Sequence, residues 1–157
     1  MREIKFRGKR IFDNTWIYGR RLAQYFLSEQ TEIVISDCTE VGGDIIYREA
    51  KIFPYTLCQY TGLEDKNGTP IYEGDIVKSV SWTEFFSTGE GEPMKALQRN
   101  MLIVFHEGAF CMMEDYHDST IPPNYWDLRS NSNFSVSGDL EVIGNVFDNP
   151  ELLKKDE

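Results

Sequence analysis

The chain has 157 residues, of which 41% are hydrophobic, and a formal net charge of -10 from 26 acidic and 16 basic residues. A chain of this length can bury a sizeable core without disulfides or a structural metal. The acidic excess argues against a general DNA-coating or membrane-coating protein, because binding to phosphate groups depends on Lys and Arg side chains that displace counterions.

Export and membrane insertion are not predicted. The N-terminal segment alternates charged and apolar residues and lacks the apolar run of a signal peptide. The longest apolar run, residues 101–105, is far shorter than a membrane-spanning helix. Three cysteines at irregular spacing are typical of reduced thiols rather than of a secreted disulfide framework: Cys38, Cys58 and Cys111. We therefore expect a soluble, cytoplasmic protein.

Alternation of apolar and polar residues with period two, which marks half-buried strands, recurs along most of the chain. Residues 4–9 and 15–22 are predicted to form a hairpin, with Asp13-Asn14 as its turn. Three further strands follow, with a turn at Gly42-Gly43-Asp44 before the last of them. They cover residues 25–27, 32–35 and 45–53.

The segment Asp65-Lys66-Asn67-Gly68 predicts a tight turn. An Asp side chain can accept backbone hydrogen bonds at the start of a turn, and Asn-Gly tolerates a positive φ at its end. Gly74-Asp75 then breaks the chain before a predicted strand over residues 76–82.

Two later segments, residues 83–100 and 117–140, are rich in Gly, Pro and polar residues and are predicted to be long loops, the first with at most a short helical turn. Between them, residues 101–116 predict a hairpin that turns at Glu107-Gly108. A last strand over residues 140–147 precedes Asn149-Pro150-Glu151, which has the signals of a short helix over residues 150–154. Many short strands and little helix predict a mainly β fold.

Several segments carry a resemblance to a known family. They are residues 4–10 (IKFRGKR), 16–19 (WIYG), 60–68 (YTGLEDKNG), 71–77 (IYEGDIV) and 141–153 (EVIGNVFDNPELL). In order and spacing they resemble the YopX family, whose members are small proteins carried mostly by bacteriophages and prophages. The matching segments span nearly the whole chain, and we therefore expect residues 1–157 to form a single YopX-like unit.

The resemblance implies a β-rich protein whose C-terminal portion is an SH3-like barrel or roll. Together with the strand and cap signals above, it predicts an N-terminal β-hairpin region over residues 1–55 and the barrel portion over residues 56–157, with the short helix at its C-terminal end. It implies a bacterial host cell as the location. It carries over no catalytic residues and no cofactor.

A cluster around the predicted hairpin contains ligand types suited to zinc or another transition metal: His106, Glu107, Cys111, Glu114, Asp115, His117 and Asp118. Residues an odd number apart on strands usually face opposite sides, so His106 and Cys111 diverge unless they meet across the hairpin. No second Cys/His pair completes a tetrahedral set. We expect no metal and no cofactor here.

The candidate carboxylate pairs for acid–base catalysis are Glu73/Asp75 and Glu114/Asp115. Such a pair needs a pocket that separates the two pKa values, and the sequence indicates none. We therefore expect turn and strand residues, no catalytic residue, and a protein that is not an enzyme.

The charge is unevenly distributed. Residues 1–21 hold seven basic and two acidic residues, a balance of +5, which leaves -15 for the rest of the chain. A basic hairpin over residues 2–21, with Trp16 and Tyr18, could bind single-stranded nucleic acid. The same cations could instead lie over an acidic surface of the same molecule or of a neighbouring subunit. The candidate contact residues are Lys5, Arg7, Lys9, Arg10, Arg20 and Arg21.

The leading hypothesis is a non-enzymatic phage or prophage accessory protein that binds a phage or host protein and forms a homo-oligomer. Tyr125 and Trp126, aromatic residues in the otherwise polar segment 117–140, are the candidate partner contacts. Nucleic-acid binding by the basic hairpin is the alternative. An acidic body that imitates DNA is the third hypothesis.

Overall fold

The computed structural model describes residues 3–26, 31–82, 96–114, 124–128 and 140–154. The chain is mainly β, as expected, and its sheets are antiparallel. It divides into two compact units, Met1–Gly62 and Leu63–Glu157. The boundary expected from the sequence, between residues 55 and 56, falls in the short 3-10 turn η1 (Pro54–Thr56).

The first unit begins with the predicted N-terminal hairpin. Strand β1 (Phe6–Lys9) pairs with β2 (Trp16–Gly19) and, on its other side, with β6 (Cys58–Glu64). Asn14 has a positive φ of 58° and the Thr15 amide donates to Asp13 at 3.2 Å, which confirms the predicted turn. The full sheet order is β2-β1-β6-β7 (β7, Pro70–Tyr72), and β6 continues across the unit boundary.

A second sheet in this unit has the order β3-β4-β5, and its strands are β3 (Arg21–Phe26), β4 (Thr31–Val41) and β5 (Asp44–Ile52). Its fully buried Ile35 and Ile52 lie against the first sheet, where glycines leave room for them. A Cβ atom on Gly8 would lie 2.4 Å from Ile52 Cδ1, and one on Gly19 would lie 2.5 Å from the Ser36 carbonyl oxygen. Close packing of the two sheets therefore requires both glycines.

The prediction of one strand over residues 15–22 was wrong. The chain leaves β2 at Gly19 and enters β3 at Arg21, so Trp16 and Leu22 belong to different sheets. Period-two alternation continues through such a sheet change, and the sequence pattern therefore hides it.

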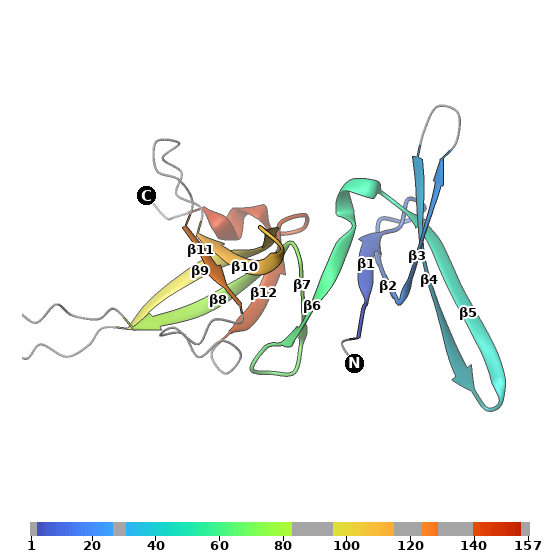
Figure 1. Ribbon diagram of the computed structural model, residues 1–157, viewed down its shortest axis with the longest axis horizontal. Helices are drawn as coiled ribbons and strands as arrows, with labels where there is room; N and C mark the ends of the chain where they lie inside the picture. The colour runs from blue at the N-terminus through green and yellow to red at the C-terminus, as the bar shows by residue number, and fades with distance from the viewer. Residues whose placement is uncertain (1–2, 27–30, 83–95, 115–123, 129–139, 155–157) are drawn as a thin grey trace, which may run out of the picture. The chain divides into compact units, whose positions relative to one another are not determined.

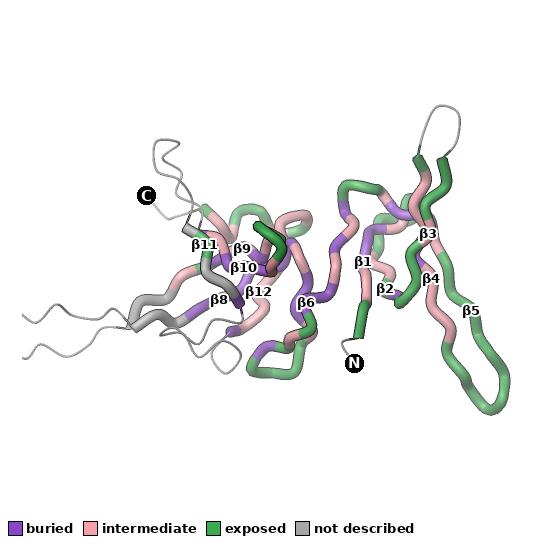
Figure 2. The backbone as a smooth tube through the Cα atoms, viewed as in Figure 1, coloured by how far each residue is buried: buried purple, intermediate pink, exposed green. Residues whose placement is uncertain are grey.

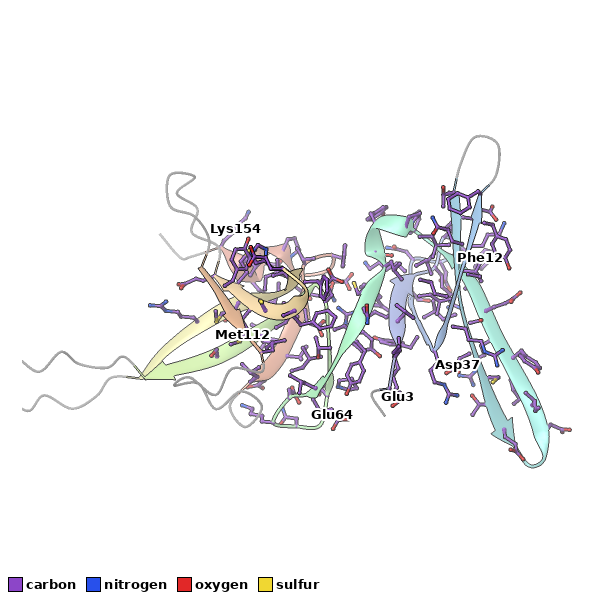
Figure 3. The ribbon with its side chains drawn as sticks, in the orientation of Figure 1. Glu3, Phe12, Asp37, Glu64, Met112 and Lys154 are labelled. Atoms are coloured by element: carbon purple, nitrogen blue, oxygen red, sulfur yellow. The ribbon has the colours of Figure 1, made fainter. Side chains whose placement is uncertain are left out.

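The second unit contains a five-stranded sheet of order β11-β10-β9-β8-β12 (Figure 1). Its strands are β8 (Asp75–Trp82), β9 (Ala96–His106), β10 (Ala109–Glu114), β11 (Asn124–Asp127) and β12 (Glu141–Asn145). The β9–β10 hairpin turns at Glu107 and Gly108, both with positive φ, as predicted. The core of this unit includes Met112, which Figure 3 labels, together with Ile71, Val77, Met101, Ile103, Phe110, Leu128 and Leu140.

Both segments predicted to be long loops contain strand residues. Residues 96–100 belong to β9, where Ala96 pairs with Trp82 and Asn100 pairs with Lys78, so the helical turn expected near them is absent. Residues 124–127 form β11 on the free side of β10. In both cases backbone hydrogen bonds to a neighbouring strand stabilise the extended conformation. This pairing overrides the weak strand preference of Ala, Gln and Asn. Leu128 and Leu140 of the second segment are buried, and the remaining residues of both segments lie outside the described ranges.

The expected barrel and C-terminal helix are not confirmed. Across the described residues the five-stranded sheet does not close, because β11 and β12 are its two edges. Residues 150–153 form a 3-10 turn, η2 (Pro150–Leu153), whose amides bond three residues back: Leu152 to Asn149 and Lys154 to Glu151. Asn149 makes no side-chain capping bond, and so short a segment does not repay the cost of helix nucleation. None of the described helical segments is long and apolar enough to cross a membrane.

Candidate interaction surface

The cations of β1 lie among aromatic rings rather than on an open surface. Arg7 and Lys9 are buried, with Arg7 Cζ 4.7 Å and Lys9 Nζ 5.6 Å from the centroid of the Trp16 ring. The register that pairs Lys9 with Trp16 places them on one face of the sheet. Lys5 Nζ lies 5.3 Å from the Tyr60 ring and 2.9 Å from Glu3. These contacts are cation–π pairs that hold the strands together.

Arg10 and Arg20 are each engaged by an acidic side chain of the first unit. Arg10 Nη2 lies 2.6 Å from Asp13 Oδ2, and Arg20 Nε donates to Asp37 Oδ1 at 3.0 Å. Burial alone raises the pKa of Asp37, but hydrogen bonds from Arg20 and from the Cys38 amide lower that pKa by more. Arg21 is exposed on β3. The predicted cations are thus dispersed over contacts within the unit instead of converging on one ligand.

Tyr125 lies in strand β11, so its predicted placement in a loop was wrong. Its ring stacks on His106 with a centroid separation of 3.8 Å and an interplanar angle of 5°. Trp126, the next residue of β11, pairs with Met112 of β10, and the side chain of Trp126 is outside what the structure describes. Tyr125 therefore contributes to the sheet surface around β9 and β10.

The residues considered for a metal site are not brought together as a ligand set. Register places His106 opposite Ala109 and Cys111 opposite Val104, hence on one face, but Cys111 is buried and its thiol contacts the Ala109 carbonyl at 3.9 Å. His117 lies outside the described residues. Among the residues that are described, no three His, Cys, Asp or Glu side chains are grouped to hold a metal ion.

Two carboxylates of the candidate catalytic pairs, Glu114 and Asp75, have structural contacts. Glu114 is buried and lies 2.5 Å from Arg99 Nη1 on the neighbouring strand. Asp75 Oδ2 accepts the Tyr72 amide at 2.7 Å, which shapes the turn at Gly74. Asp115 lies outside the described residues. The geometry thus gives Glu114 and Asp75 roles in the fold.

The far end of the β4–β5 hairpin is an exposed apolar element that was not predicted from the sequence. Strand β3 accompanies β4 only as far as Ser36, so residues 37–48 form a two-stranded extension, which we call the ribbon. Figure 1 shows the ribbon running past the end of β3, and Figure 2 shows its β5 side as exposed. Figure 3 labels Asp37 on the ribbon. Apolar side chains project from both of its faces: Val41 is 56% exposed, Ile45 59%, Ile46 42% and Tyr47 70%.

One signal in the sequence could have indicated the ribbon. The run Ile45-Ile46-Tyr47 follows directly on the Gly42-Gly43 turn, so successive apolar residues must point to opposite faces. A strand that is apolar on both faces is normally covered on both. In the ribbon neither face of these residues is covered.

The two units differ strongly in charge. Residues 1–62 contain nine basic and eight acidic residues, a balance of +1, whereas residues 63–157 contain seven basic and 18 acidic residues, a balance of -11. The acidic character of the protein therefore belongs to the second unit, and the ribbon belongs to the nearly neutral first unit.

Comparisons with known proteins identify a family and a related fold. A family model described as YopX protein matches residues 5–154. The crystal structure of protein EF1440 from Enterococcus faecalis is similar over 96% of this chain and 98% of that chain, with a TM-score of 0.51 and 23% sequence identity. At that identity the likeness concerns the fold alone. A search of curated proteins found no match.

Proposed function

The chain belongs to the YopX family, and from this premise we propose that it is a non-enzymatic interaction module of a phage or prophage. In this proposal it acts in the cytoplasm of the bacterial host, and the ribbon is the element that binds another protein chain. In this proposal the acidic second unit is an opened SH3-like roll, which its antiparallel strand order supports.

The observation that carries the proposal is the exposure of four large apolar side chains on the two-stranded ribbon. A two-stranded hairpin on its own is at best marginally stable in water, and proteins rarely leave contiguous apolar surface uncovered without a use for it. Contact with another chain would bury these side chains and stiffen the ribbon at the same time.

The proposal is tested by affinity capture from bacteria that produce the tagged protein together with a second, differently tagged copy and the other phage proteins. The variant Ile45→Ser/Tyr47→Ser changes only the ribbon. Phe12→Ser is the matched control, because Phe12 is 96% exposed in the β1–β2 turn of the same unit.

We expect the ribbon variant to lose a protein that the wild type and Phe12→Ser both retain. Identical sets of bound proteins for all three forms would contradict the proposal. Binding of oligonucleotides that falls steeply with salt and disappears on substitution of Arg10, Arg20 and Arg21 would instead favour the basic-hairpin hypothesis.

A further inference from the structure

Strand β5 is an edge strand along the ribbon, and its geometry determines which backbone groups face outward. Within the described part of the chain it pairs with β4 along its length, and its other edge is bridged only at its C-terminal end, where Arg10 pairs with Ile52 and the Ile11 amide donates to the Lys51 carbonyl at 3.0 Å. Residues 44–48 of that edge have no described strand beside them. The turn at Gly42 and Gly43, with φ of 64° and 90°, makes Val41 and Asp44 the closing pair of a two-residue hairpin. In an antiparallel pair, successive residues direct their backbone N–H and C=O groups alternately toward and away from the partner strand. The backbone groups of Asp44, Ile46 and Arg48 therefore point toward β4. Those of Ile45 and Tyr47 point away from it.

We infer that this edge pairs with the β5 edge of a second copy of the chain, antiparallel and centred on Ile46. The inference rests on the proposed function and names the partner at the ribbon. In this register Ile46 faces Ile46 of the second copy on the two-fold axis. Ile45 faces Tyr47, and Asp44 faces Arg48, each pair occurring twice.

Self-complementarity selects this register. A two-fold axis perpendicular to the sheet places each face of one copy beside the same face of the other copy. Residues that point to the same face can then be opposite each other only if the axis passes midway between one residue and the same residue of the second copy. Moving the centre to Tyr47 places Ile46 opposite Arg48 and Asp44 opposite Ala50. Moving it to Arg48 places two like charges opposite each other, which is destabilising. Centring on Ile46 matches opposite charges with each other and apolar side chains with each other.

The two charged side chains that would meet across this interface, Asp44 and Arg48, are available to form an ion pair with a second copy. Asp44 and Arg48 take part in no ion pair with other residues that the structure describes. Asp37, which is opposite Arg48 on β4, is already held by Arg20 at 3.0 Å. Arg48 can therefore meet an acidic group from outside its own chain.

Pairing would also account for the apolar side chains near the axis. Ile45 and Tyr47 would form hydrogen-bonded pairs across the interface, and the two Ile46 side chains would meet at a non-hydrogen-bonded position, where side chains lie closer together. The two three-stranded sheets become one continuous sheet of six strands, which removes both exposed β5 edges.

The test is a charge exchange, read out as molar mass by light scattering and sedimentation over increasing protein concentration. Arg48→Asp and Asp44→Arg each place like charges opposite each other at both ends of the pairing. The double variant Asp44→Arg/Arg48→Asp restores opposite charges in the reversed sense. Arg21→Asp, on the opposite edge of the same sheet, is the control for the change in net charge.

We expect the mass of a dimer for the wild type, for Arg21→Asp and for the double variant, and the mass of a monomer for each single exchange. Recovery in the double variant also shows that neither substitution prevents folding. Monomeric wild type at every concentration, or single variants that dimerise like the wild type, would overturn the inference. In that case the capture experiment with Ile45→Ser/Tyr47→Ser still decides the proposed function, because loss of a different bound protein would uphold it.

Discussion

The carboxylate of Asp65 accepts the backbone amide of Val142 at 3.0 Å, and this bond connects residues 77 positions apart in the sequence. The other carboxylate oxygen accepts the amides of Asn67 at 2.8 Å and Thr69 at 2.9 Å. One buried side chain therefore shapes the turn after β6 and fastens it to β12 in the second unit.

Asp65→Asn is predicted to destabilise the second unit by about 3 kcal/mol. The amide group replaces one acceptor oxygen with a donor that faces a backbone N–H, and the charge that strengthened the remaining bonds is lost. Chemical unfolding followed by circular dichroism measures the effect. Glu64→Gln, a substitution at the exposed neighbouring residue, serves as control and should leave the unfolding midpoint unchanged.

The contribution of Asp65 is also predicted to depend on pH. Burial alone raises the pKa of Asp65, but hydrogen bonds from the amides of Val142, Thr69 and Asn67 lower it by more, so the pKa lies below its ordinary value of 3.8. A carboxyl group whose pKa is lower in the folded than in the unfolded state stabilises the fold fully above the unfolded value. That contribution is lost as the pH falls through the folded value. The stability difference between wild type and Asp65→Asn should be constant near neutral pH and shrink below 3.8; a difference that grows on acidification contradicts this assignment.

Gly19→Ala is predicted to destabilise the first unit by about 1–3 kcal/mol, because the new Cβ would lie 2.5 Å from a backbone oxygen that cannot move aside like a side chain. The matched variant is Gly42→Asn. Gly42 has a φ of 64° and open space around it, and Asn tolerates that conformation. Thermal unfolding should show a lower midpoint for Gly19→Ala and little change for Gly42→Asn, and equal midpoints would contradict the close packing of the two sheets.

Local chemistry explains which parts of this fold can be predicted from the sequence. The turns at Asp65–Gly68 and Glu107–Gly108 were correctly predicted, because Asp, Asn and Gly have conformational preferences that act within four residues. Strands β9 and β11 were underestimated, because their pairing depends on partners that period-two patterns do not identify.

The candidate surface was harder to predict for a related reason. Arg7 and Lys9 carry the charges of a binding strand in the sequence, but β1 is a central strand, and its side chains are buried beside Trp16. Ile45 and Tyr47 resemble core residues in the sequence, but they lie in the two-stranded part of the sheet beyond the end of the β3–β4 pairing, where their side chains are exposed. Sequence patterns report the polarity of a side chain, whereas exposure depends on where each neighbouring strand stops.

Ile46→Cys is predicted to form a disulfide-linked dimer under mild oxidation. In a non-hydrogen-bonded antiparallel pair the facing Cα atoms lie about 4.5 Å apart, which is within the range of about 4.4–6.8 Å for disulfides. The experiment uses a Cys38→Ser background, since Cys38 is a half-buried cysteine in the ribbon. Ile45→Cys is the control, because Ile45 faces Tyr47 instead of itself. Equal cross-linking of both variants on non-reducing gels would contradict the register.

The most direct measurement of edge pairing is hydrogen exchange of the individual β5 amides at low and high protein concentration. We predict that the amides of Ile45 and Tyr47, which point away from β4, become protected as concentration rises, while the Ile46 amide, which points toward β4, is protected throughout. In Arg48→Asp the concentration dependence should disappear. Exchange of Ile45 and Tyr47 that is equally fast at every concentration would contradict the pairing of this edge with a second copy.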